Sequence, residues 1–144
     1  YTVDPADALI GLGATAIGAL PQGYVQNDTA TGRYMTAIGK GMVATEKGLA
    51  LSAEDRLRRA VIERLMCSLT FSAAEVRALA PSADLARTLI EEARQVVAED
   101  EYGFVAATGD GFVITEAGRP FMRSIAARFD AYLPRRTARH SVAV

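Results

Sequence analysis

Cysteine, histidine and tryptophan are nearly absent from this chain of 144 residues, which has one cysteine, one histidine and no tryptophan. The single cysteine, Cys67, cannot form an internal disulfide and cannot by itself supply a cysteine-based metal site. It lies in an apolar helical stretch, so we interpret it as a small buried hydrophobic residue. His140 falls in a basic tail, where a histidine usually faces solvent. Neither residue belongs to a recognisable catalytic motif.

Long apolar runs are also missing. None approaches the roughly 20 residues that a membrane-spanning helix needs, and there is no secretory signal, so we expect a cytoplasmic protein with no membrane partner. The charges balance, with 16 Lys and Arg against 17 Asp and Glu, as is typical of one ordinary globular domain. Because the sequence begins at Tyr1 without a methionine, we expect a piece of a longer protein.

The composition changes along the chain. Residues 1–40 are poor in charge and rich in glycine, alanine and threonine, whereas the chain from Ser52 onward is dense in arginine and glutamate. Glycines at positions 39 and 41 mark the change. We therefore expect two parts, residues 1–40 and residues 41–144.

Local patterns after residue 27 predict mostly helices. A short helix is expected between Asp28 and Ile38, and an extended segment over 47–52. Serine capping signals then predict three further helix starts. These helices are expected from Ser52 to about Leu69, from Ser72 to the residue before Pro81, and from Ser82 to about Ala98.

The last part of the chain combines a hairpin with a closing helix. Alternating apolar residues on both sides of Thr108-Gly-Asp-Gly predict a β-hairpin. A final helix is expected from Thr115 to Pro134, with a buried stripe of Phe121, Ile125, Phe129 and Leu133. The expected fold is therefore mainly α with a small β-hairpin, an α+β arrangement in the order of a winged-helix domain.

A winged-helix domain often binds DNA through its third helix and its wing, but the charges argue against this use. The third helix has the wrong balance for a phosphate surface, and the hairpin tip offers Asp110 and no Lys or Arg. Only the tail 135–140 is basic. We therefore expect no nucleic-acid partner, and keep as the alternative a free-standing winged-helix module that binds nucleic acid or protein. The charged residues counted on this helix are Asp84, Glu91, Glu92, Glu99 and Asp100 against Arg87 and Arg94.

The glycine-rich stretch Gly11-Leu-Gly-Ala-Thr-Ala16 matches the G-x-G-x-x-G/A spelling of a dinucleotide-binding loop. That loop requires a following helix whose first turn holds the pyrophosphate, and Pro21 comes too soon to leave room for one. The glycines of this stretch still indicate that the backbone comes close to a neighbouring group. Glycines at 11, 13 and 18 let the backbone pass near another backbone or a flat ligand.

Several stretches together resemble the C-terminal third of the oxygen-independent coproporphyrinogen III oxidase family, and the resemblance covers essentially the whole chain. It implies a heme-pathway enzyme that oxidatively decarboxylates two propionates of coproporphyrinogen III, giving protoporphyrinogen IX. Members use a 4Fe-4S cluster, held by a Cys-x-x-x-Cys-x-x-Cys motif, and S-adenosylmethionine. This chain lacks that motif, so we expect no cofactor in the fragment and no catalysis by it alone. The stretches are GLGATAIG at 11–18, YVQN at 24–27, GLALSAEDRLRRAVI at 48–62, DGFVITEAGR at 110–119 and FDAYL at 129–133.

The resemblance also implies a cofactor-binding site. Ile17 matches a position that packs near the adenosyl group, and Gly13 and Ala16 are expected to help the backbone approach it. Tyr24, Gln26 and Asn27 could line the substrate cleft or form a structural loop, and both interpretations stay open.

For the domains, the resemblance implies that residues 1–40 are the remnant of a radical S-adenosylmethionine barrel. Residues 41–144 would form a winged-helix-like domain that packs on its own catalytic domain and covers the cleft. Arg135 and Arg136 could meet substrate propionates, and the parent enzyme is expected to be a monomer. In the isolated fragment, residues 1–27 are expected to be extended, mobile or packed on a neighbouring molecule.

Overall fold

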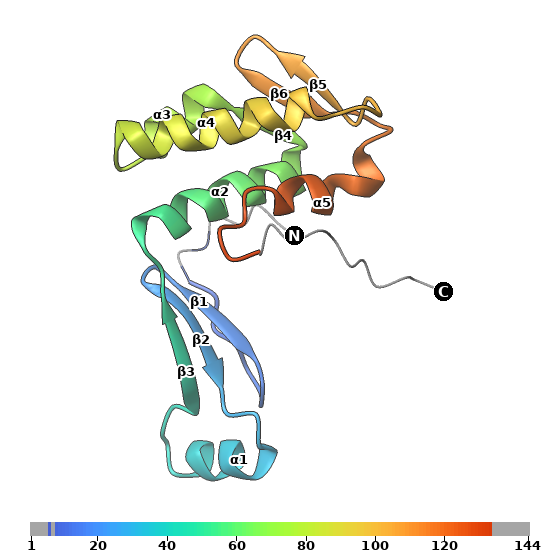
Figure 1. Ribbon diagram of the computed structural model, residues 1–144. Helices are drawn as coiled ribbons and strands as arrows, with labels where there is room; N and C mark the ends of the chain where they lie inside the picture. Colours follow the sequence, from blue (N-terminus) through green and yellow to red (C-terminus); the bar gives the residue numbers. More distant parts are fainter. Residues whose placement is uncertain (1–5, 7, 134–144) are drawn as a thin grey trace. The chain divides into compact units, whose positions relative to one another are not determined.

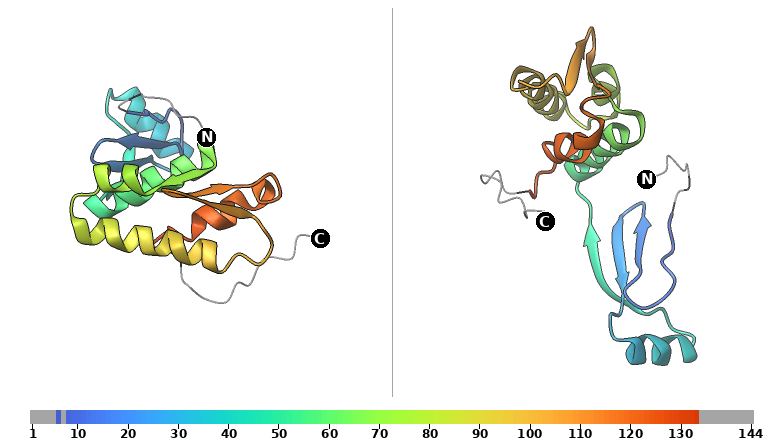
Figure 2. Two further views of the ribbon diagram at one scale, coloured as in Figure 1. Left: turned by 90° about the horizontal axis from the view of Figure 1, so that it is seen from above. Right: turned by 90° about the vertical axis from the view of Figure 1, so that its right-hand side faces the viewer.

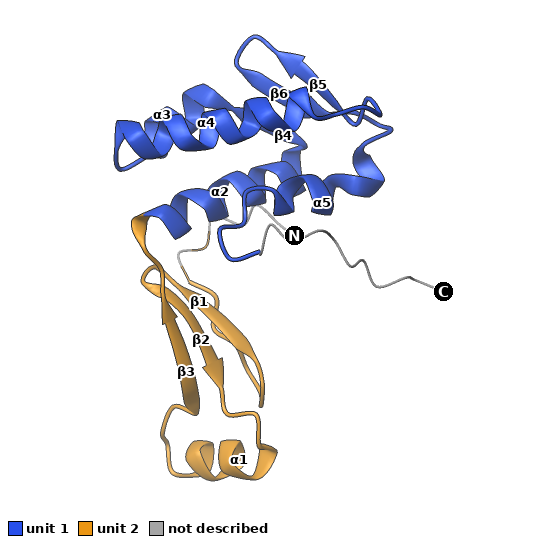
Figure 3. Cartoon of the chain, viewed as in Figure 1, with its two compact units in different colours: residues 1, 54–144 blue, residues 2–53 orange. Residues whose placement is uncertain are grey.

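The computed structural model describes residue 6 and residues 8–133, which divide between Ala53 and Glu54 into two compact units (Figure 3). Unit 2 is the earlier part of the chain and unit 1 the later part. This division falls after the boundary expected near residue 40. The reason is strand pairing: β3 (Thr45–Ala50) is antiparallel to β2 (Gly23–Asn27), so the segment after the glycines belongs with the N-terminal part.

Unit 2 is a three-stranded antiparallel sheet with one helix. Its order is β1-β2-β3, where β1 (Ile17–Leu20) and β2 form a hairpin. Helix α1 (Thr31–Gly39) connects β2 to β3 and lies at one end of the sheet (Figure 1). The short helix and the extended segment expected from the sequence are therefore confirmed. Residues 17–20 and 23–27 are extended, in β1 and β2, as expected for part of residues 1–27, but the pairing of β2 with β3 was not expected.

Unit 2 has almost no hydrophobic interior. Among its described residues only Gly18, Gly23 and Ala44 are buried, and all six residues of β3 are exposed. A sheet is normally stabilised by apolar side chains that are buried away from water on at least one of its faces. The described part of this unit contains no large buried side chain that could provide this stabilisation.

Unit 1 contains four α-helices and a second small antiparallel sheet of order β4-β6-β5, and the β5–β6 hairpin projects past α3 and α4 (Figures 1 and 2). Ser72 and Ser82 cap α3 and α4 through bonds from the backbone N–H groups of Glu75 and Leu85, as the sequence predicted. Strand β4, which pairs with β6, was not expected. The elements are α2 (Ala53–Ser68), β4 (Thr70–Ser72), α3 (Ala73–Leu79), α4 (Ala83–Ala98), β5 (Val105–Thr108), β6 (Gly111–Ile114), the 3-10 helix η1 (Arg119–Phe121) and α5 (Met122–Ala127).

The core of unit 1 joins its four described α-helices to its sheet. The ring of Phe71 stacks on Phe112 and on Phe129, with centroids 5.5 Å apart in each pair. Cys67 is half-buried at the edge of α2 instead of fully buried. Because this core is continuous, unit 1 carries its own hydrophobic stabilisation. Its buried members are Leu57, Val61, Leu65, Phe71, Ala73, Val76, Ala86, Leu89, Ala93, Val96, Val105, Phe112, Ile114, Ile125, Ala126 and Phe129.

The closing helix is shorter than the sequence predicted, and the expectation of one helix with a four-residue stripe was wrong. Phe121 is 46% exposed and Leu133 is 53% exposed, whereas Ile125 and Phe129 are buried. A turn precedes η1 because the Thr115 hydroxyl accepts a bond from the Gly118 N–H and donates to the carbonyl of Gly103.

The described residues form a mixed fold with two small antiparallel sheets and five α-helices, so they contain more strand than the single hairpin expected. Within residues 6 and 8–133, no helix has both the length and the apolar character that crossing a membrane requires.

Candidate functional site

The glycine-rich loop folds back against β1. Leu9 and Ala19 exchange two backbone hydrogen bonds of 2.7 and 2.9 Å, which close the loop that runs from Gly11 to Ala16. A Cβ placed on Gly11 would lie 3.0 Å from the carbonyl carbon and oxygen of Ile17, and one on Gly18 would lie 2.8 Å from the Leu9 oxygen. Glycines 11 and 18 therefore permit close backbone contacts, as the sequence predicted.

Gly13 has a different reason to be glycine. Its φ is +105°, and no atom lies within 4 Å of a Cβ placed there. Its N–H donates to the Tyr34 hydroxyl of α1 at 3.0 Å. Thr15 also has a positive φ, at 66°, which is costly for a β-branched residue. Gly13 and Thr15, both in the left-handed region, therefore bend the loop. Hydrogen bonds from residues outside the loop hold it in place.

Two amide side chains of β2 supply most of that support. The Asn27 Nδ2 group donates to the carbonyls of Gly11 at 2.9 Å and Gly13 at 3.0 Å. The Gln26 Nε2 group donates to the Thr15 carbonyl at 3.2 Å. Of the two interpretations left open for these amides, their contacts favour the structural loop. The loop is followed by a strand and not by a helix, which agrees with the rejection of a phosphate-binding loop.

Ile17 begins β1, and its side chain is 58% exposed. The pairing register puts Ile17 and Ala19 on the same face of the sheet, because side chains alternate along a strand. A cross-strand row of Leu9, Ala19, Tyr24 and Leu49 crosses this face beside Ile17. We call these five residues the apolar sheet face. Leu9 and Leu49 are both exposed, so this face offers an uncovered apolar surface.

A charged brace holds α1 beside the loop. Arg33 donates to both carboxylate oxygens of Asp28, at 2.6 and 2.8 Å, and to Glu46 at 3.1 Å. These bonds from Arg33, with one from the Ala30 N–H, hold the pKa of the Asp28 carboxyl below its usual range. The Asp28 carbonyl accepts from the Thr15 N–H at 3.1 Å, so the brace continues into the loop.

Among the sequence-predicted site residues, the structure brings Gly13, Ala16 and Ile17 together in this loop and its adjoining strand. Ala16 is half-buried, and its carbonyl accepts from the Asn27 N–H at 2.9 Å. Arg135, Arg136 and His140 lie outside the described residues. Sequence reasoning missed Tyr34 and the clamp role of Asn27, because a bond between residues 16 or 21 positions apart leaves no periodic signal.

The described residues offer no set of ligands for an iron–sulfur cluster. Cys67 is the single cysteine of the chain, and in residues 6 and 8–133 no three His, Cys, Asp or Glu side chains gather as metal ligands would. A 4Fe-4S cluster needs several thiolates. The described residues therefore do not fit a cluster site, whereas an exposed β-branched side chain beside glycine backbone fits the flat apolar face of an adenine.

Curated relatives align with most or all of this chain. The chain is 41% identical to the oxygen-independent coproporphyrinogen III oxidase of Bradyrhizobium diazoefficiens over 154 aligned residues, which cover 100% of this chain and 32% of that protein. It is 43% identical to the enzyme of the same name from Paracoccus denitrificans, over 92% of this chain and 29% of that protein. The chain is homologous to the C-terminal portion of oxygen-independent coproporphyrinogen III oxidases. The resemblance seen in the sequence is confirmed.

The fold gives the same answer for this oxidase family. The structure matches coproporphyrinogen III oxidase of Escherichia coli, described as a radical SAM enzyme, with a TM-score of 0.75 and 27% identity. The match covers 92% of this chain and 30% of that one. No family model matches the chain. The chain thus spans about a third of the length of the oxidases it matches.

Proposed function

We propose that this chain is the C-terminal part of an oxygen-independent coproporphyrinogen III oxidase that converts coproporphyrinogen III to protoporphyrinogen IX in heme biosynthesis. The homology to oxidases of that name over the whole chain supports this assignment. The structural observation that carries it is the bare apolar sheet face of unit 2, because a unit without its own core requires a partner surface.

That partner surface is the catalytic domain of the same protein. Unit 2 exposes Leu9, Ile17 and Leu49 on one face, and no described side chain of the unit covers them. Burying such residues gives roughly 1.5–3 kcal/mol each relative to exposure. In this proposal unit 2 is the last part of the radical S-adenosylmethionine barrel, and it becomes stable by packing on the strands and helices that precede it.

Unit 1 would serve as a winged-helix-like cover of the substrate cleft. Its continuous core lets it form without the barrel, and its element order of helices followed by the β5–β6 hairpin is the order of a winged helix. The alternative, a nucleic-acid module, is not favoured. Asp110 at the hairpin tip is engaged by Ser72 and by the Ala74 N–H of α3, and α4 carries three acidic against two basic side chains: Asp84, Glu91 and Glu92 against Arg87 and Arg94.

The cofactors belong to the whole enzyme. In the whole enzyme, a bound cluster and S-adenosylmethionine would supply the radical chemistry that acts on the substrate propionates, and the cluster ligands would lie outside this chain. Within the chain, Ile17 would pack against the adenosyl group, while Gly13 and Ala16 shape the loop behind it. A cytoplasmic location and a monomeric parent enzyme stay predictions.

A truncation tests the covering role. The full-length protein ending at Ser52 lacks unit 1 but keeps the loop and the sheet of unit 2. We expect it to retain its cluster, measured by iron content and visible absorbance, and to lose the anaerobic formation of protoporphyrinogen IX. Full activity of the truncated protein would contradict the covering role. Salt-dependent binding of duplex DNA by the 144-residue chain would favour the interaction module instead.

A further inference from the structure

Asn27 is the residue that fixes the shape of the glycine-rich loop. A side-chain amide has two N–H donors, and the two bonds of its Nδ2 group go to the carbonyls of Gly11 and Gly13, at 2.9 and 3.0 Å. Its backbone N–H donates to the carbonyl of Ala16 at 2.9 Å. One residue of β2 thus holds the start, the middle and the end of the loop.

The hydrogen bonds that Asn27 donates to the loop, here called the loop clamp, also affect the position of Ile17. The space beside Gly11, where a Cβ would stand, is only 3.0 Å from the Ile17 carbonyl carbon and oxygen and 3.1 Å from the Ala16 carbonyl carbon. Gly11 therefore packs against the backbone of Ile17, from the Ala16 carbonyl carbon to the Ile17 carbonyl. A shift of Gly11 would move this backbone, and with it the exposed Ile17 side chain.

The strand is irregular at the clamp. Gln26 pairs with Lys47 and Asn27 with Thr45, so Glu46 is an extra residue in β3. A bulge of this kind changes the direction of neighbouring side chains and is often found beside functional sites. Next to it, the Asp28 carbonyl holds the N–H of Thr15, and from α1 the Tyr34 hydroxyl holds the N–H of Gly13. Both contacts fix left-handed residues of the loop.

We propose that Asn27 is a positioning residue of the cofactor site: through Gly11 it sets where Ile17 meets the adenosyl group of S-adenosylmethionine. This inference rests on the proposed function, since it concerns the same site. It predicts that Asn27 affects cofactor affinity through Ile17 and that the two residues are energetically coupled.

The test is anaerobic titration of the full-length protein, with its cluster reconstituted, by S-adenosylmethionine. Asn27→Asp keeps the side-chain size, removes both N–H donors and sets a carboxylate against two carbonyls. Gln22→Glu is the matched control, because it makes the same amide-to-carboxylate change at an exposed turn of the same hairpin. We expect dissociation constants raised about fivefold by Ile17→Ala and by no more than this factor by Asn27→Asp, with no change for Gln22→Glu.

The double variant separates positioning from general stability. Because Asn27 acts through Ile17, adding Asn27→Asp to Ile17→Ala should weaken binding by less than about twofold further. An equal loss in both backgrounds would overturn the inference, as would unchanged binding by Asn27→Asp when Ile17→Ala binds weakly. Unchanged binding by Ile17→Ala would instead overturn the adenosyl contact in the proposed function, and the positioning role with it.

A milder variant covers the case in which Asn27→Asp does not fold. Tyr34→Phe removes only the acceptor of the Gly13 N–H and leaves the ring in α1. Its dissociation constant should rise about threefold, and the rise should again disappear in the Ile17→Ala background. A rise that persists there, or no rise at all, would contradict the positioning role of the loop clamp.

Discussion

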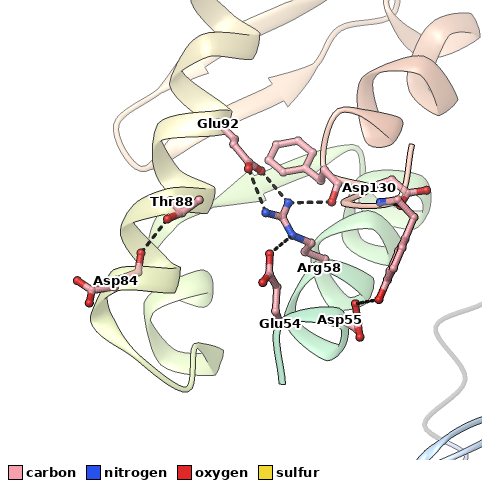
Figure 4. A network of polar contacts seen from close by, with 9 residues as sticks. Glu54, Asp55, Arg58, Asp84, Thr88, Glu92 and Asp130 are labelled. Atoms are coloured by element: carbon pink, nitrogen blue, oxygen red, sulfur yellow. Dashed lines mark hydrogen bonds and ion pairs between the residues drawn. The ribbon is translucent and has the colours of Figure 1, made fainter. Parts of the chain in front are cut away.

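Arg58 and Glu92 are 34 positions apart in the sequence, and two parallel hydrogen bonds of 2.8 and 3.0 Å join them across α2 and α4 (Figure 4). Arg58 is only 8% exposed, and it also donates to Glu54 at 2.7 Å and to the Phe129 carbonyl at 3.0 Å. The bonds to Glu92, more than those to Glu54, raise the pKa of the guanidinium and outweigh the opposite effect of burial. The Arg58 guanidinium therefore connects both helices to the segment that directly follows α5.

Removing one partner of this pair should destabilise unit 1. We expect Glu92→Gln to lower the free energy of unfolding by about 3 kcal/mol, because a buried guanidinium loses its main counter-charge. Urea unfolding followed by circular dichroism would measure it. Glu91→Gln is the control on the same helix, since the Glu91–Arg94 pair is exposed and should contribute less than about 0.5 kcal/mol. Equal losses for the two variants would contradict the structural role of the Arg58–Glu92 pair.

Gly118 should not tolerate a side chain. A Cβ there would lie 2.0 Å from the Phe104 carbonyl oxygen, whereas one on Gly109 would meet nothing within 4 Å. We expect Gly118→Ala to cost about 3 kcal/mol or more, because backbone atoms must move to relieve the overlap. Gly109→Ala is the matched control and should leave the thermal midpoint almost unchanged. A small effect of Gly118→Ala would contradict the close approach of the Gly118 backbone to the Phe104 carbonyl.

Acid should loosen the hairpin tip from α3. Bonds from the Ser72 hydroxyl and the Ala74 N–H, with the nearby Arg77 charge, lower the pKa of the Asp110 carboxyl from its ordinary value of 3.8. The Asp110 carboxylate therefore binds a proton more readily in the unfolded chain than in the folded protein. The stabilisation by ionised Asp110 is complete above about pH 5 and is lost as the pH falls through the folded-state pKa.

Asp110→Asn should thus melt below the wild type at pH 7, and the two midpoints should converge as the pH falls below the folded-state pKa of Asp110. Asp28, Glu75 and Asp100 also have lowered pKa values, so both proteins lose stability in acid, the variant less steeply. Glu101→Gln, at an exposed position after α4, should follow the wild-type curve. A constant difference between Asp110→Asn and wild type at every pH would contradict the linkage.

The apolar sheet face should behave differently in the short chain and in the whole protein. Leu49 is exposed in β3, so Leu49→Asp should change the free energy of unfolding of the 144-residue chain by less than about 0.5 kcal/mol. In the full-length protein the same change would bury a charge at the contact with the catalytic domain. We expect it to lower the midpoint or prevent soluble expression there. Equal tolerance in both contexts would contradict the docking of this face.

Local signals in the sequence predicted most of unit 1. Ser72 and Ser82 begin helices because their hydroxyls satisfy backbone N–H groups three positions ahead, and the spacing of Leu57, Val61 and Leu65 placed one face of α2 in the core. The limits were equally physical. A three-residue strand such as β4 has too few residues for a detectable alternation, and it exists because β6 supplies its hydrogen bonds.

The candidate site was predicted only in part. The spelling of residues 11–18 indicated close approach, and the contacts of Gly11 and Gly18 confirm it. The sequence could not show that Asn27 clamps the loop, because that bond depends on the β1–β2 register and on the bulge at Glu46. The boundary after residue 53 likewise follows from strand pairing, which composition does not record.

The most direct test of the assignment is the reaction itself. The full-length protein, with reconstituted cluster, reductant and S-adenosylmethionine, would be incubated anaerobically with coproporphyrinogen III and the tetrapyrroles identified by mass spectrometry. We predict a product in which two propionates have become vinyl groups. Recovery of unchanged coproporphyrinogen III by a protein that binds its cluster and cleaves S-adenosylmethionine would contradict the assignment.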